Sequence, residues 1–100
     1  MKRLILAAAA LVLAAGTAQA QQADGRVLAL SCLNCHGPGG KSPGEIPSIA
    51  GKTEDFIKNA LADFRDGKRS GPSATVMGRL AKGYSDAEIE AVAKYIATLK

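Results

Sequence analysis

The sequence predicts a small helical domain, and three observations lead to this prediction. Apolar residues recur at helical spacing in two segments, 53–66 and 85–99. Side chains that cap helices stand at the start of both segments, and a glycine closes the first. No alternating pattern of the kind typical of a strand precedes the two cysteines. With 100 residues, the chain has room for one domain at most.

The first twenty residues have the pattern of a secretory signal peptide. Lys2 and Arg3 give a positive start, an apolar run covers 4–15, and Ala18-Gln19-Ala20 is a small-residue cleavage site. The apolar run is short for a bilayer span, and no stop-transfer flank follows it. We therefore expect residues 1–20 to be a signal peptide and residues 21–100 to be an exported, periplasmic protein with no membrane anchor.

The charge balance gives no support to a nucleic-acid-binding function. Removing Lys2 and Arg3 from the 13 basic residues leaves 11 against 9 acidic ones, a net charge of +2 for residues 21–100. Aromatic residues are few and the basic residues are scattered along the chain.

A first helix is predicted from Asp24 to about Ser31. Asp24 can cap its first turn. Three apolar side chains of this segment are expected in the core: Val27, Leu28 and Leu30.

The segment Cys32-Leu33-Asn34-Cys35-His36 is the attachment pattern of a c-type haem. Its spacing sets two thiols at the separation of the two porphyrin vinyl groups, so that Cys32 and Cys35 can each form a thioether. His36 then lies under the iron as the proximal ligand. These are the only two cysteines and the only histidine in the chain.

Three other interpretations of this motif are weaker. A thioredoxin-type dithiol normally follows a strand, and a structural zinc site usually needs four ligands, whereas this motif offers three. A simple disulfide in an exported protein would leave His36 unexplained.

A glycine- and proline-rich loop, 37–44, and an extended connector, 46–51, follow the motif. The carbonyl of Pro47 can accept a hydrogen bond from a histidine Nδ1–H, a contact that orients an axial imidazole. Pro47 can equally be an ordinary turn proline, and the residues alone leave both interpretations open.

A second helix is predicted from its cap, Thr53, to about Asp66, before Gly67. Its expected core stripe is Phe56, Ile57, Ala60, Leu61 and Phe64. The basic turn 68–72 is either a solvated surface or a docking patch for an acidic partner.

Met77 is the only methionine after residue 20 and lies among small, weakly helical residues. An isolated methionine is most often a core gap-filler. With a haem present, its thioether is the best available distal iron ligand, because Lys68 or Lys82 would first have to lose a proton.

The last helix begins with a capping box, Ser85 to Glu88. Its expected buried stripe is Ile89, Val92, Ala93, Ile96 and Leu99.

With these elements, residues 21–100 resemble a class I cytochrome c over nearly their whole length. The resemblance implies a compact all-α fold, in which the first and last helices cross and one covalently attached haem c is enclosed except at one edge. It implies that Cys32 and Cys35 carry the thioethers, that His36 is proximal and that Met77 is distal. Pro47, Ile49 and Gly51 are similar to the family's Pro-x-Leu-x-Gly segment, which favours the histidine-orienting role for Pro47.

The stretch 77–86, Met-Gly-Arg-Leu-Ala-Lys-Gly-Tyr-Ser-Asp, is similar to the monohaem cytochrome subunit of flavocytochrome c sulfide dehydrogenases, and 64–69 is also similar to that subunit. This likeness implies sulfide oxidation, with an FAD-containing flavoprotein as partner and a downstream electron acceptor. It implies a docking face around Ala50, Gly51, Val76 and Gly78.

Three functions therefore remain for testing. The first is electron transfer as an oxidoreductase subunit, without catalysis of its own, because no general acid, base or nucleophile pair is evident. The second is a free soluble carrier similar to cytochromes c4 and c5. The third is a haem protein in which the sixth iron position is open to small ligands.

Overall fold

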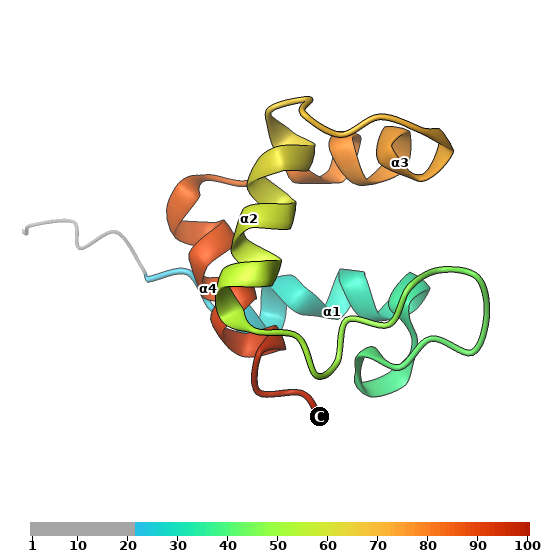
Figure 1. Cartoon of the computed structure of the whole chain (residues 1–100). Coiled ribbons are helices and arrows are strands. Elements are labelled where there is room, and N and C mark those ends of the chain that lie inside the picture. Colours follow the sequence, from blue (N-terminus) through green and yellow to red (C-terminus); the bar gives the residue numbers. More distant parts are fainter. Residues whose placement is uncertain (1–21) are drawn as a thin grey trace, which may run out of the picture.

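The computed structural model describes residues 22–100, and this part of the chain is helical, with no strand (Figure 1). The all-α prediction is thus confirmed. The elements in chain order are α1 (Gly25–His36), the short 3-10 helix η1 (Pro38–Gly40), α2 (Glu54–Arg65), α3 (Pro72–Ala81) and α4 (Asp86–Ile96). The predicted signal peptide, 1–20, lies outside the described residues.

The core lies where α1 and α2 pack on α4, while α3 packs on α2. The predicted stripe of α4 is confirmed, apart from Leu99, which follows the helix and is half-buried. The buried core residues are Ala29, Ile57, Leu61, Ile89, Val92, Ala93 and Ile96. They come from three helices, so the burial of apolar surface holds the helices together as one domain.

Helices α1 and α4 cross at a glycine. A Cβ atom added to Gly25 would lie 2.0 Å from the carbonyl oxygen of Ala91, far inside van der Waals contact. Ala29, one turn further along α1, is completely buried. The two helices therefore approach through small residues, as the resemblance implied for the first and last helices.

All three predicted N-terminal caps are present. The Asp24 carboxylate accepts hydrogen bonds from the amides of Arg26 and Val27. The Thr53 hydroxyl accepts one from the Phe56 amide. Ser85 forms the complete capping box, described below. These bonds satisfy amides that the first turn of a helix otherwise leaves free.

One prediction about helix extent is wrong, and one helix was not predicted. The first helix does not end near Ser31 but continues to His36, so the haem-attachment motif forms its last turns. The segment around Met77 is also a regular helix, α3, which begins with Pro72 at a position where the missing amide costs nothing. Its packing on α2 offsets the low helix propensity of its residues.

Three predicted core residues are exposed: Val27 by 60%, Leu30 by 56% and Phe56 by 50%. The reason in α1 is that Gly25 and Ala29 occupy the inner face, which leaves Val27 and Leu30 on the outer one. Phe56 lies at the edge of its stripe, and its ring is covered by the Lys52 ammonium, 5.2 Å from the ring centre.

Candidate haem-binding site

The last turns of α1 carry the three residues of the motif. Cys32 and His36 are four residues apart and so lie on one side of the helix, with Cys35 beside them. Both thiols are free; Cys32 is half-buried and Cys35 is exposed. Burial raises the pKa of the Cys32 thiol, which therefore stays protonated at neutral pH. The helix thus places the two cysteines and the histidine on adjoining positions.

The two ring nitrogens of His36 have different surroundings. The Nδ1 atom lies 2.5 Å from the carbonyl oxygen of Pro47 and donates a hydrogen bond to it in the corresponding tautomer. The Nε2 atom makes no hydrogen bond within residues 22–100. The Nε2 atom is nevertheless accessible from outside the protein. If it were fully buried it would be a buried nitrogen without a hydrogen-bond partner, and residues 22–100 contain no such side-chain atom. His36 as a whole is only 9% exposed, so the surrounding protein holds the ring in place. Nε2 is the ring nitrogen that is left free to bind a ligand.

The loop that carries Pro47 is tied down at three points. The carbonyl of Gly40 accepts bonds from the amides of Ile49 (2.8 Å) and Ala50 (3.0 Å), and the Ser48 hydroxyl accepts one from the Ser42 amide (2.9 Å). The amide of Gly51 bonds the carbonyl of Leu99, 2.9 Å away, beyond the end of α4.

Gly40 is the residue in this region whose role the sequence interpretation missed. It is buried with a positive φ of 77°, and a Cβ there would lie 3.1 Å from the Ala50 nitrogen. The sequence showed only a glycine-rich break. The position of this glycine between His36 and Pro47 was the one indication in the sequence that the loop closes tightly there.

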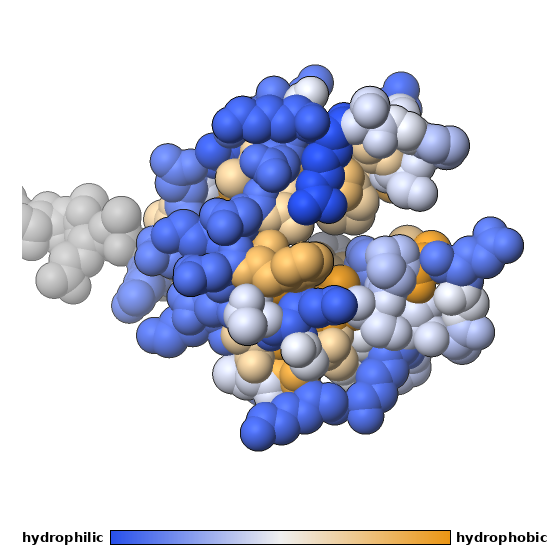
Figure 2. Space-filling model, in the orientation of Figure 1, coloured by the Kyte–Doolittle hydropathy of each residue, from blue (hydrophilic) through white to orange (hydrophobic). Residues whose placement is uncertain are grey.

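Met77 lies on α3, half-buried and in contact with the core cluster. In Figure 1, α3 lies above the C-terminal part of α1, and α2 and α4 lie to the left of both. Figure 2 shows that the surface is hollowed between α3 and α1 and that apolar atoms lie on both sides of the hollow. His36 and Met77 thus come from the two helices that face each other across it.

Gly78 does not share a face with Val76. A Cβ atom on Gly78 would lie 3.4 Å from the Phe64 carbonyl oxygen, so Gly78 faces α2. Val76 is 60% exposed. The predicted docking face therefore keeps Val76 and loses Gly78.

The residues present fit a covalently held porphyrin. Exposed large apolar side chains are present on α3 and on the loop after the motif, among them Ile46, Val76 and Leu80. A flat apolar disc would bury surface of this kind. The two thiols could supply the attachment points, and the free Nε2 atom and the thioether could supply the iron donors. Within residues 22–100, no three His, Cys, Asp or Glu side chains are placed so that they could hold a metal ion together.

Comparison with known proteins leads to the same kind of site. The family model described as cytochrome c matches residues 22–100. The chain is 43% identical to the cytochrome subunit of sulfide dehydrogenase from Chlorobaculum tepidum, with 95% of this chain and 96% of the relative aligned. It is 36% identical to cytochrome c-553 from Nitratidesulfovibrio vulgaris, over 99% of this chain and all of the relative.

A third relative is longer than this chain. The thiosulfate dehydrogenase electron acceptor from Stutzerimonas stutzeri is 33% identical over 86% of this chain and 44% of its own length. Within the described residues, no helix combines the length and the apolar character that crossing a membrane requires.

Proposed function

The chain belongs to the cytochrome c family, and from this premise we propose that it is a periplasmic electron-transfer protein, with His36 and Met77 as axial iron ligands, that serves as the cytochrome subunit of a flavoprotein sulfide dehydrogenase. Family membership itself gives the chain one covalently bound haem c and a role in electron transport. The ligand set, the compartment and the flavoprotein partner are the proposed parts.

The observation that carries the proposal is the state of His36. One ring nitrogen is bonded to the Pro47 carbonyl, and the other is free. A hydrogen bond at Nδ1 fixes the tautomer and the ring orientation and makes Nε2 a better donor to a metal. Cys32 and Cys35, on the same helical turns, would hold the porphyrin next to this ring through two thioethers.

Met77 supports six-coordination. It comes from the helix on the far side of the hollow, and residues 22–100 contain no other methionine, histidine or free cysteine outside the motif. When bound, haem c accepts and releases one electron at its iron, and a thioether ligand favours the ferrous state. The chain's own contribution is to hold the ligands, exclude water with apolar side chains and leave an edge for a partner.

The partner is proposed from the likeness to the sulfide dehydrogenase subunit, which covers nearly all of both chains. The name of the Stutzerimonas relative also supports a dehydrogenase as electron donor. The periplasmic location is proposed from the signal-peptide pattern of residues 1–20.

The test is purification from the native cells, followed by absorption spectra of the oxidised and reduced protein. A c-type haem spectrum with the weak far-red sulfur-to-iron band supports His/Met ligation. Flavin absorbance in the same complex, and haem reduction on addition of sulfide, support the sulfide dehydrogenase. A pure haem protein that sulfide does not reduce would favour a free carrier similar to cytochromes c4 and c5.

The open-site alternative is separated by carbon monoxide. Rapid and complete binding to the reduced wild-type protein shows an open sixth position and contradicts ligation by Met77. Negligible binding supports a closed, six-coordinate iron.

A further inference from the structure

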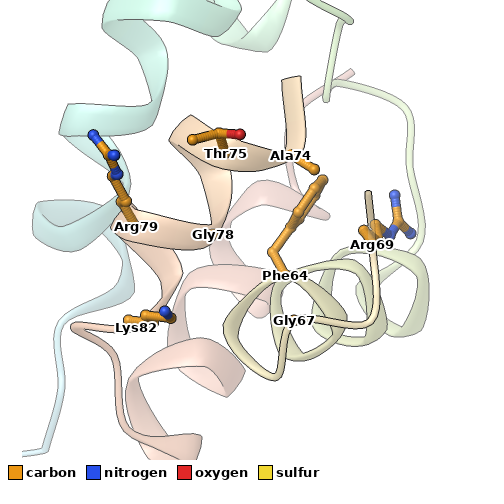
Figure 3. Close-up of a pocket in the computed structure, with 8 residues that line it drawn as sticks. All are labelled: Phe64, Gly67, Arg69, Ala74, Thr75, Gly78, Arg79 and Lys82. Atoms are coloured by element: carbon orange, nitrogen blue, oxygen red, sulfur yellow. The ribbon is translucent and has the colours of Figure 1, made fainter. Parts of the chain in front are cut away.

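A second cavity lies on the other side of α3, between α3 and the end of α2. It has a volume of about 230 Å³. Its lining residues are Phe64, Gly67, Arg69, Ala74, Thr75, Gly78, Arg79 and Lys82 (Figure 3). A water takes about 30 Å³ of liquid volume, so the cavity has room for one small polyatomic ion and several waters.

This cavity is separate from the proposed iron site. Successive residues of an α-helix are rotated by about 100°, so Thr75 and Arg79, each two residues from Met77, lie on roughly the opposite side of α3. Gly78 also faces α2 rather than the hollow. The cavity therefore has no part in holding the haem.

The lining is cationic, with no acidic residue. Arg69, Arg79 and Lys82 come from two different segments of the chain, and none of the three forms an ion pair within residues 22–100. The Arg69 guanidinium is held over the Phe64 ring, 4.8 Å from its centre. Figure 3 shows Arg69 beside the Phe64 ring, and Arg79 and Lys82 on the other side of Gly78, with the Arg79 guanidinium directed away from the ring.

Two carboxylates of this region are bound to Arg65 and do not line the cavity. Arg65 bonds Asp66 at 3.2 Å and Asp86 at 2.6 Å. One guanidinium balances only one of these two negative charges, but neither carboxylate belongs to the lining that carries the three cations. Positive charge gathered around a cavity without counter-charge raises the local concentration of anions.

We propose that the cavity between α2 and α3 binds a small divalent oxyanion of the sulfate type. Arginine offers planar N–H groups that match the spacing of oxyanion oxygens, and Lys82 and the Thr75 hydroxyl add further donors. A divalent ion interacts with all three cations at once, which favours it over chloride. The long exposed side chains of Arg79 and Lys82 change rotamer within nanoseconds, so they can close on the ion.

The test is a titration of the reduced holoprotein with sodium sulfate, followed by amide NMR and compared with sodium chloride at equal ionic strength. The expected result is a saturable shift of the Gly67, Thr75 and Gly78 amides with sulfate, and little shift of the Ala93 amide in α4. Shifts that rise linearly without saturation, or that chloride reproduces, would overturn the proposal.

A variant series identifies the binding groups. The double variant Arg69→Ala/Arg79→Ala should bind sulfate about fivefold to tenfold more weakly, on the scale of losing partly exposed charge-assisted hydrogen bonds. Lys41→Ala, which removes an exposed cation from the loop after α1, is the matched control and should bind like wild type. Equal affinity in all three proteins contradicts the assignment. If the double variant loses its haem spectrum, Lys82→Gln provides the same comparison with a milder change.

Discussion

The Nδ1 atom of His36 lies 2.5 Å from the carbonyl oxygen of Pro47. This contact links the last residue of α1 to a loop that is held by Gly40, Ser48 and the segment after α4. The orientation of the proposed proximal ligand therefore depends on backbone eleven residues away along the chain.

Pro47→Ala should raise the midpoint potential and lower stability. The carbonyl remains in the variant, but the ring that fixes φ is lost, so the acceptor is placed less firmly and its bond to Nδ1 weakens. A less basic imidazole stabilises ferric iron less, which moves the potential upwards. Stability should fall by up to about 1 kcal/mol.

Potentiometric titration measures the change in midpoint potential, and thermal unfolding measures the change in stability. Pro43→Ala changes an exposed proline of the same loop and is the control; equal shifts in the two variants would show that the Pro47 contact has no special role.

Met77→Ala should lower the midpoint potential, abolish the far-red sulfur-to-iron band and let the reduced protein bind carbon monoxide. The reason is that removing the thioether leaves the iron with one axial ligand from the protein. Val76→Ala, at the exposed neighbouring position, should change none of these properties. A Met77→Ala protein with the wild-type potential would show that Met77 is a core residue and not the ligand.

Gly25→Ala should destabilise the protein by about 1–3 kcal/mol, because a well-packed contact would have to open. The new methyl group would lie 2.0 Å from the Ala91 carbonyl oxygen, so α1 and α4 must move apart. For a domain of this size, each kcal/mol lowers Tm by about 4–8 °C. Thermal unfolding of the holoprotein measures the change. The matched control is Gly44→Ala, since nothing lies within 4 Å of a Cβ at Gly44 and its φ is not positive; a Gly25→Ala protein as stable as this control would contradict the close crossing.

Ser85→Ala should cost about 1 kcal/mol through loss of the capping box. The Ser85 hydroxyl accepts from the Glu88 amide at 3.2 Å, and the Glu88 carboxylate accepts from the Ser85 amide at 3.0 Å. Urea unfolding of Ser85→Ala, Glu88→Ala and the double variant gives the coupling between the two. Strictly additive effects would mean that the two bonds act independently. Ser70→Ala, at an exposed position outside the helices, is the control for the loss of a hydroxyl.

Local chemistry in the sequence was sufficient to predict α2 and α4. Both begin with a side chain that satisfies amides of its first turn, and both have a stripe of large apolar residues on one face. For the site, the spacing of Cys32, Cys35 and His36 was sufficient to place them on one short stretch of chain. The possible bond from His36 to Pro47 also followed from elementary donor and acceptor chemistry.

The features that local patterns missed depend on tertiary packing. α1 meets α4 through Gly25 and the buried Ala29, so hydrophobicity alone assigned Val27 and Leu30 to the wrong face, whereas Leu28 does pack against the core. α3 contains proline, glycine and two β-branched residues, and it is helical because it packs on α2. The clustering of Arg69 with Arg79 and Lys82 likewise exists only once α2 and α3 come together.

A charge at Val76 should slow electron transfer to a redox partner without shifting the midpoint potential. Val76 is 60% exposed on α3, next to Met77 and beside the hollow, where an apolar contact with a partner would be buried. Val76→Asp places an unpaired charge in that contact, which should lower the bimolecular rate by about tenfold or more, equivalent to about 1.4 kcal/mol.

Val27 supplies the control for this prediction. It is also a valine and also 60% exposed, but it lies on the outer face of α1, away from the crossing with α4. Val27→Asp therefore introduces the same charge at an equally exposed position elsewhere on the surface. Stopped-flow reduction at several ionic strengths compares the two variants, with potentiometry to confirm an unchanged midpoint. If both variants slow transfer equally, the effect is one of net charge alone, and the face around Val76 is not the docking surface.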